Sequence, residues 1–296
     1  MKALQSVTFS CAVGMEREMI ETALGVTSGF TSPHRVATKI GADILDSGGS
    51  AVEAMVAAAA AIAVVYPHMN GIGGDGFWLI QRKGQAPIAI SACGQAARLA
   101  TPEWYAAQGQ KDTIPARGAL AALTVPGTIG GWQAALALVD EARQIPLAEL
   151  LAPSIALATQ GIAVTRNQTL TTEEKIGSLR DVPGFGDIYL CNEQAPRPGD
   201  TLVQAALGAT LSAIAENGTD SFYRGDIART HAHFLEIQGS PLRLSDFEIY
   251  NAELQTPLTV TTSLGTLYNL GPPTQGMSSL AILALFDRLG VTQGEG

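Results

Sequence analysis

The sequence predicts an α+β fold in a single domain that spans residues 1–296. Three observations predict it: 46% of the residues are hydrophobic, apolar residues recur with a helical period along much of the chain, and two stretches between the helices have the composition of β-hairpins. A chain of 296 residues with this composition can bury a sizeable core. Hairpins set among buried helices are typical of helices layered over sheets, and no internal repeat or long linker divides the pattern.

Two helices are predicted in succession near the start of the chain. Over residues 31–49, apolar residues recur every four positions until a pair of glycines supplies a stop. Ser50 and Glu53 then form a capping-box pattern that begins the second helix. The alanine-rich run over residues 51–65 is apolar on nearly every face, so we expect this helix to be buried on all sides.

The glycine-rich stretch NGIGGDGF, residues 70–77, follows the second helix. Its glycines have the G-x-G-x-x-G spacing of a dinucleotide-binding loop, but such a loop needs a strand before it and a helix after it. Here a helix precedes the glycines and an apolar strand pattern follows them. The acidic residue that such a fold carries about twenty positions further on is also missing, because no Asp or Glu lies between Asp75 and Glu103. We therefore interpret the stretch as a tight helix-to-strand connection and expect no cofactor.

Short-range signals predict the remaining elements. A first hairpin turns at a Lys-Gly pair after the glycine stretch, and residues 254–273 form a second hairpin around another glycine turn. Asp200 or Thr201 caps a helix that lies within residues 200–218. Further helices are expected within residues 125–142, 146–161 and 278–290, and a surface excursion is expected over residues 173–190.

Charge and the potential metal ligands exclude several classes of function. The net charge is −9, with no cluster of Lys and Arg, which argues against a nucleic acid or an anionic membrane as partner and favours a small-molecule substrate. The three cysteines are odd in number and far apart, so neither a disulfide framework nor a cysteine metal cluster is indicated. His231 and His233 lie two residues apart, which puts them on different sides of a helix, and we expect no metal site.

The apolar stretches are too short for a transmembrane helix. The longest, over residues 54–66, falls short of the roughly twenty apolar residues that span a bilayer. Residues 3–15 have faint signal-peptide character, but polar side chains interrupt them. We expect a cytoplasmic protein, with the periplasm as the alternative compartment.

Five blocks of sequence keep a specific order from about residue 30 to residue 290. They are SPHRVATKIGADILDSGGSAVEAMVAAAAAIAVVYPHMNGIGGDGFWLI, TVPGTIGGWQAAL, LLAPSIALATQGIAVT, GDTLVQAALGATLSAIAENGTDSFYRGDIA and LGPPTQGMSSLAIL. Together they resemble the gamma-glutamyltransferase family of N-terminal-nucleophile hydrolases. The resemblance is specific because five blocks hardly fall in one order by chance.

The resemblance implies a four-layer αββα sandwich and a proenzyme that cuts itself into two subunits. A threonine freed at the amino terminus of the small subunit attacks an amide carbonyl, and its own α-amine can act as the general base. This chain resembles the large subunit, so no catalytic residue is assigned to it, and the small subunit is its implied partner. A heterotetramer of two such pairs is compatible with the family. The family also has a helical stretch between the proline-rich turn and the cut, so either the natural large subunit extends past Gly296 or it is unusually short.

The chain differs from the family at the position of the main substrate-binding residue. The family has an arginine in a D-x-R-E-x-A-P segment, and this arginine binds the α-carboxylate of the glutamyl group. Alignment on AISACGQAARLATPEWY puts Cys93 at the arginine position, so the cation that binds the α-carboxylate is absent. Either the pocket is remodelled for a small amide without an α-amino-acid head, as in oxamate-amidohydrolase-like and cephalosporin-acylase-like branches, or Arg98 moves in to compensate. We favour the first reading.

Three residues are therefore candidate substrate-binding residues: Cys93, Arg98 and Asp75. Asp75 stands where the family usually has another glycine, and its alternative role is a local turn hydrogen bond. We interpret Cys93 as a pocket wall or a core residue rather than a nucleophile, because nothing in the sequence supplies it with a base.

The sequence thus predicts the large subunit of an autoprocessed amidohydrolase that cleaves the amide bond of a small substrate such as oxamate. Two alternatives stay open. One is a standard gamma-glutamyl hydrolase or transpeptidase that acts on glutathione-like substrates, and the other is a non-catalytic homologue that binds a small molecule.

Overall fold

The alanine-rich helix α2 (Ala51–Val65) packs among other helices, in a computed structural model that describes residues 24–291. Its predicted capping box is present, because Ser50 Oγ accepts the Glu53 N–H at 3.3 Å and the Glu53 carboxylate accepts the Ser50 N–H at 2.6 Å. Three helices pack against α2: α1 (Arg35–Asp46), α4 (Thr128–Leu136) and α5 (Leu147–Gln160).

One side of α2 is less buried than the sequence predicts. Ten of its fifteen residues are buried, but Met55 is 44% exposed, and Ala59 and Ile62 on the same side are only partly buried. The expectation of burial on all sides is therefore wrong for this stripe. The stripe faces a cavity instead of another described element.

Two antiparallel sheets form the middle of the molecule. In the first, the strand order is β1-β2-β5, and β1 pairs with β2 from Gly76↔Ala92 to Ile80↔Ile88, which confirms the first predicted hairpin. The second sheet is the predicted hairpin β6–β7, with Gly265 at a positive φ of 139° where it turns into β7. The strands are β1 (Gly76–Ile80), β2 (Ile88–Ala92), β5 (Glu253–Gln255), β6 (Leu258–Thr262) and β7 (Gly265–Asn269), and a separate two-residue pair joins β3 (Ile162–Ala163) to β4 (Thr201–Leu202).

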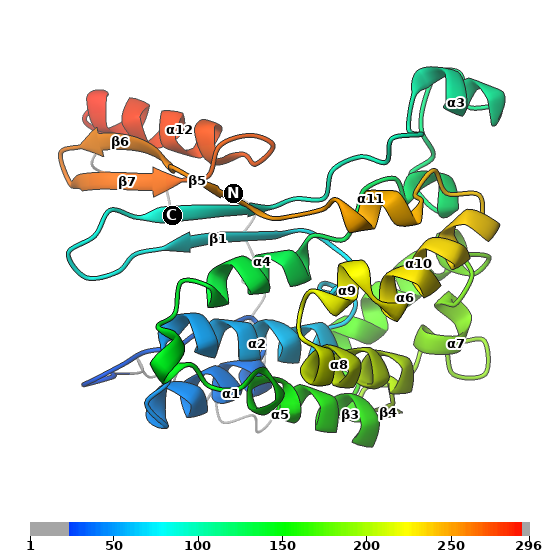
Figure 1. Cartoon of the computed structure of the whole chain (residues 1–296), viewed down its shortest axis with the longest axis horizontal. Helices are drawn as coiled ribbons and strands as arrows, with labels where there is room; N and C mark the ends of the chain where they lie inside the picture. The colour runs from blue at the N-terminus through cyan, green and yellow to red at the C-terminus, as the bar shows by residue number, and fades with distance from the viewer. Residues whose placement is uncertain (1–23, 292–296) are drawn as a thin grey trace, which may run out of the picture.

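Helices cover the two sheets in four layers. Figure 1 shows the order from top to bottom as α12 (Gly276–Arg288), the β6–β7 hairpin, the β1–β2–β5 sheet, and then α4 and α2. Helix α12 packs on β6 and β7, and α4 packs on β1 and β2. The chain passes from the first sheet to the second within two residues, because β5 ends at Gln255 and β6 begins at Leu258. This arrangement confirms the α+β class and the αββα order.

Residues 173–190 lie at the surface as predicted, with no buried residue among them, and they are largely helical. One local prediction needs correction. The predicted cap at Asp200 or Thr201 is wrong, because Thr201 pairs in β4 and helix α8 begins only at Ala205; the Asp200 carboxylate accepts the Arg197 N–H at 2.7 Å instead. The remaining helices are α3 (Pro102–Ala107), α6 (Arg166–Leu179), α7 (Phe185–Tyr189), α8 (Ala205–Asn217), α9 (Ser221–Arg224), α10 (Asp226–Ile237), α11 (Leu244–Glu248) and the 3-10 turns η1 (Ala119–Ala121) and η2 (Glu141–Arg143).

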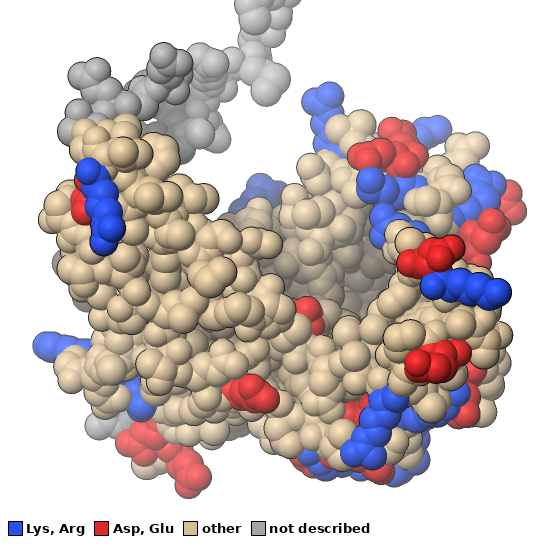
Figure 2. Space-filling view, turned by 90° about the horizontal axis from the view of Figure 1, so that it is seen from above, with Lys and Arg blue, Asp and Glu red and all other residues tan. Residues whose placement is uncertain are grey.

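The surface divides into a charged and an uncharged part. Figure 2 shows Lys, Arg, Asp and Glu gathered on one side of a central hollow, the side of α3, α10 and α11 in Figure 1, whereas few of them lie on the side of α12 and the β6–β7 hairpin. No helix within residues 24–291 is long and apolar enough to cross a membrane. Cys93 and Cys191 are free thiols, whereas Cys11 and residues 3–15 lie outside the described part of the chain.

Candidate functional site

The glycine stretch is anchored on the amino-terminal end of α4. The Gly74 carbonyl oxygen accepts the Gly127 N–H at 2.8 Å, the Thr128 N–H at 2.9 Å and the Thr128 hydroxyl at 2.9 Å. The order of elements is helix α2, glycine stretch and strand β1, as the sequence predicts, so the glycines do not open a helix as a dinucleotide-binding loop does. These bonds fix the position of Asp75, the residue just before β1.

The structure brings two of the three candidate residues, Asp75 and Cys93, together. Gly76 lies opposite Ala92 in the β1–β2 register, so the residues just beyond this pair face each other. Asp75 Oδ1 accepts the Gly94 N–H at 2.9 Å, and Asp75 Oδ2 lies 3.7 Å from the Cys93 sulfur, which donates to it. The Asp75 side chain therefore links two strand ends and does not make only a local turn bond.

The thiol of Cys93 stays protonated in this environment. Burial raises the pKa of Cys93, and the Asp75 carboxylate raises it further through its charge and through the hydrogen bond that it accepts. The thiolate is the nucleophilic form of cysteine, so a raised pKa disfavours nucleophilic attack by this sulfur. Asp75 is exposed and Cys93 is half-buried, so both border solvent.

Two glycines, Gly94 and Gly127, allow close backbone packing next to Asp75 and Cys93. A Cβ on Gly94 would lie 1.6 Å from the Val125 carbonyl oxygen, and a Cβ on Gly127 would lie 1.9 Å from the Ala92 carbonyl oxygen. Real Cβ atoms do not approach so closely, so these positions require glycine for close packing rather than for a positive φ. The end of β2 thus packs directly on the turn that leads into α4.

Tyr250 contacts the backbone of the turn that leads into α4. It is buried, and its hydroxyl lies 3.5 Å from the Gly127 carbonyl oxygen. Burial raises the pKa of Tyr250, and the negative charge of Asp75 raises it further, so the phenol stays neutral. Sequence reasoning missed Tyr250, since it lies 123 residues from Gly127 and no local pattern marks it.

A second buried tyrosine, Tyr223, holds the first turn of α4. Its hydroxyl accepts the Gly130 N–H at 2.8 Å and donates to the Pro126 carbonyl oxygen at 2.8 Å. Its ring lies against that of Tyr250, with 5.0 Å between the ring centroids. The two tyrosines therefore fix the helix end on which the glycine stretch is anchored.

Arg98 does not join Asp75 and Cys93. Its side chain is exposed, its backbone N–H donates to Asp246 Oδ1 at 3.1 Å, and within residues 24–291 its guanidinium makes no hydrogen bond or ion pair. Arg98 lies five positions after Cys93 in the chain. A bridge between Ala96 and Thr124 holds this intervening segment.

The described residues contain no cluster of three or more His, Cys, Asp or Glu side chains with metal-binding geometry. The ring of His231 packs at 5.6 Å from the ring of Phe222, and burial lowers the pKa of His231. The ring of His231 therefore packs against an aromatic side chain.

Comparison with known proteins adds a second, independent line of information. Residues 37–295 match the family model described as gamma-glutamyltranspeptidase. The chain is 51% identical over 260 residues to the oxamate amidohydrolase proenzyme of Klebsiella pneumoniae, a match that covers 87% of this chain and 49% of that protein. It is 35% identical over 278 residues to the glutathione hydrolase-like YwrD proenzyme of Bacillus subtilis, covering 94% of this chain and 52% of that protein. The chain thus spans about half the length of these relatives.

Solved structures agree with the sequence relatives. The gamma-glutamyltranspeptidase from Pseudomonas nitroreducens superposes with a TM-score of 0.82 at 27% identity, over 92% of this chain and 81% of that chain. The cephalosporin acylase from Bacillus halodurans superposes with a TM-score of 0.75 at 30% identity, over 80% of this chain and 44% of that chain. With its layered fold, its ordered sequence blocks and these matches, the chain belongs to the gamma-glutamyltranspeptidase family.

Proposed function

We propose that this chain is the large subunit of an autoprocessed amidohydrolase that cleaves a small amide such as oxamate. The observation that carries the proposal is the 51% identity to the oxamate amidohydrolase proenzyme of Klebsiella pneumoniae, against 35% to the glutathione hydrolase-like proenzyme of Bacillus subtilis. Both relatives are proenzymes about twice as long as the matched part, which supports a second subunit that supplies the amino-terminal nucleophile.

The site supports a substrate without a glutamyl head. A glutamyl α-carboxylate needs a cation, and the position aligned with the family's arginine holds Cys93, whose sulfur lies 3.7 Å from the Asp75 carboxylate. A carboxylate at this position repels an anionic group rather than binding it, so in this proposal the carboxylate of oxamate lies away from Asp75. In this proposal Cys93 and Asp75 shape the wall of the substrate pocket, and the exposed Arg98 does not replace the missing arginine.

The large subunit's part in the reaction is to bind and position the amide. In the proposed reaction, the terminal hydroxyl of the small subunit attacks the amide carbonyl, the amine leaves, and water releases the acyl group. The fixed carboxylate of Asp75 supplies acceptor oxygens to that pocket, whereas the thiol proton of Cys93 is already donated to Asp75. We further propose that residues 1–296 form one domain and that the enzyme acts in the cytoplasm, as a pair of subunits or as two pairs.

The test uses the full-length proenzyme after its processing. We expect turnover of oxamate and little turnover of a gamma-glutamyl anilide, with kcat/KM measured for each substrate. Arg98→Ala should leave both values unchanged, since the Arg98 side chain is exposed and within residues 24–291 makes no hydrogen bond or ion pair with Asp75 or Cys93. Efficient anilide turnover that is lost in Arg98→Ala would refute the proposal and favour a glutamyl enzyme in which Arg98 supplies the cation.

A glutathione-type activity is the second candidate, because the glutathione hydrolase proenzyme of Escherichia coli is 32% identical to this chain over 282 residues. The same pair of assays separates it from the first candidate. Turnover of neither substrate, together with an intact chain that does not process itself, would instead indicate a non-catalytic homologue.

A further inference from the structure

Two buried polar side chains, Ser240 and Asp246, lie at the corner between α10 and α11. Burying a carboxylate is costly unless its oxygens are hydrogen-bonded, and within residues 24–291 Asp246 makes no ion pair. Its oxygens accept backbone N–H groups from two different segments instead. Oδ1 accepts the Arg98 N–H at 3.1 Å, and Oδ2 accepts the Arg243 N–H at 2.9 Å. The carboxylate therefore ties the segment of Arg98 to the corner.

The corner holds both strands of a short antiparallel ladder. The first strand, residues 95–97, lies against the second strand, residues 123–125, with N–H···O bonds of 2.8 and 3.0 Å between them. Asp246 holds the residue that follows the first strand. Ser240 holds the residue that precedes the second strand, because its hydroxyl donates to the Ala122 carbonyl oxygen at 2.6 Å. The corner thus fixes the ladder from both strands.

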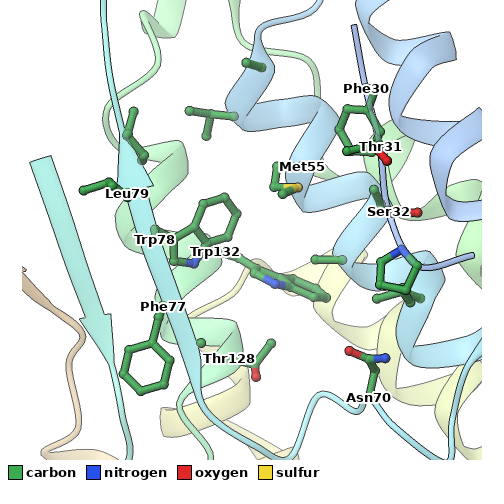
Figure 3. Close-up of a pocket in the computed structure, with 18 of the residues that line it drawn as sticks. Phe30, Thr31, Ser32, Met55, Asn70, Phe77, Trp78, Leu79, Thr128 and Trp132 are labelled. Atoms are coloured by element: carbon green, nitrogen blue, oxygen red, sulfur yellow. The ribbon is translucent and has the colours of Figure 1, made fainter. Parts of the chain in front are cut away.

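Both strands of the ladder lead to the candidate site. The first strand begins two residues after Cys93. The second strand leads into the turn before α4, and Figure 3 shows Thr128, the first residue of α4, next to β1. The N–H and the hydroxyl of Thr128 each donate to the Gly74 carbonyl oxygen at 2.9 Å, which fixes the position of Asp75. The ladder therefore connects Asp75 and Cys93 through the backbone.

We propose that Asp246 and Ser240 are positioning residues for the Asp75–Cys93 pair: by holding the two strands of the ladder, they keep the carboxylate and the thiol in contact. They act through the backbone, since within residues 24–291 neither of them hydrogen-bonds to Asp75 or Cys93. The inference rests on the proposed function in one respect, that this pair forms a wall of the substrate pocket. The contact within the pair does not depend on which substrate binds.

The test is the pH profile of Cys93 alkylation by iodoacetamide in the full-length protein, measured by mass spectrometry of the alkylated peptide. Burial and the Asp75 carboxylate raise the pKa of Cys93, so Asp75→Asn should shift this profile to lower pH. Asp246→Ala removes both acceptors and releases the first strand, so its profile should already lie at lower pH. Adding Asp75→Asn to Asp246→Ala should then shift the profile by no more than about half as much as in the unaltered protein.

Glu53→Ala is the matched control for Asp246→Ala. Glu53 is also a buried carboxylate that accepts two backbone N–H groups, but it does so at the start of α2. Its loss should destabilise the protein and leave the Cys93 profile unchanged. An unchanged profile in Asp246→Ala, or an equal shift in Glu53→Ala, would overturn the proposal.

A second pair of variants tests the other strand and carries the test if Asp246→Ala does not fold. Ser240→Ala removes the hydroxyl that binds the Ala122 carbonyl oxygen, so it should shift the Cys93 profile in the same direction. Ser154→Ala in α5 is its control, because Ser154 is equally buried and its hydroxyl has no hydrogen-bond partner among residues 24–291. Equal profiles for these two variants would contradict the inference.

Kinetics separate this inference from the proposed function. KM for oxamate should rise about 10-fold in Asp246→Ala, with a smaller change in kcat, because the wall binds the substrate whereas the other subunit supplies the nucleophile. An equal rise in Glu53→Ala would indicate general loosening and overturn the positioning role. Absence of oxamate turnover by the unaltered protein would refute the proposed function, whereas shifted Cys93 profiles would still support the inference.

Discussion

The carboxylate of Asp75 and the thiol of Cys93 face each other across the end of the β1–β2 hairpin, with Oδ2 3.7 Å from the sulfur. Neither residue type alone indicates this pairing. It follows from the antiparallel register, which places Gly76 opposite Ala92 and so brings the two flanking residues together. Because of this contact, a cation introduced at position 93 would lie next to the Asp75 carboxylate.

Cys93→Arg alone should gain little affinity for gamma-glutamyl substrates. The new guanidinium would pair with the Asp75 carboxylate, which is already held by the Gly94 N–H. Asp75→Gly together with Cys93→Arg frees the cation, so we expect KM for a gamma-glutamyl anilide to fall about 10- to 100-fold relative to Cys93→Arg, the equivalent of one charge-assisted hydrogen bond. Equal KM values for the single and double variants would show that Asp75 does not control this position.

The Cys93 thiol should react slowly with iodoacetamide at neutral pH. Its pKa is raised by burial and by Asp75, so the thiolate fraction at a given pH is smaller than for an ordinary cysteine, and the alkylation rate should rise only at higher pH. Asp75→Asn removes the negative charge and should shift this pH profile toward lower pH. Mass spectrometry of the alkylated peptides in the full-length protein gives the rates, with the exposed Cys191 as internal reference. An unchanged profile in Asp75→Asn would contradict the role of the carboxylate.

Gly94→Ala should strongly destabilise the protein. Its Cβ would overlap the Val125 carbonyl oxygen at 1.6 Å, and backbone cannot move aside as a flexible side chain can. We expect a loss of about 2–4 kcal/mol in the free energy of unfolding, as for other overpacked sites. The control is Gly177→Ala in the interior of α6, where a Cβ meets nothing within 4 Å and should stabilise the helix by about 0.5–1 kcal/mol. Thermal unfolding of both variants measures the difference, and equal Tm values would contradict the packing described here.

Glu53→Gln should destabilise the start of α2. Glu53 is buried, and its two carboxylate oxygens accept the Ser50 N–H at 2.6 Å and the Ile145 N–H at 2.6 Å. An amide side chain has one acceptor oxygen, so one partly buried donor loses its charged partner, at a cost of about 1.5–3 kcal/mol. Glu216→Gln on the exposed side of α8 is the matched control and should leave Tm unchanged. A Glu53→Gln protein as stable as that control would show that the capping box contributes little.

Much of the fold was predictable because its signals are local. The capping box of Ser50 and Glu53, the two hairpins and the stop at Gly161 each depend on residues close together in sequence. The start of α8 was not predictable in this way. Its capping candidate Thr201 pairs instead with Ala163, a partner 38 residues away, and such pairing overrides a local helix signal.

The candidate site was only partly predictable for the same reason. Position 93 stood out through its departure from a family motif, and Asp75 through its place in a glycine stretch. Their contact depends on strand register, and the support from Tyr223 and Tyr250 depends on packing between segments about a hundred residues apart. Nothing in the spacing of these tyrosines indicates their place behind Gly127.

The Gly74 carbonyl, with its three donors from Gly127 and Thr128, has a consequence for binding. These bonds form when the chain folds, so the conformational entropy of the glycine stretch is lost before any substrate arrives. Asp75 is therefore preorganised, and a ligand that contacts it need not order the loop again. The affinity of a ligand that contacts Asp75 and Cys93 should therefore depend on the chemistry of these two side chains. It should depend hardly at all on movement of the backbone that carries them.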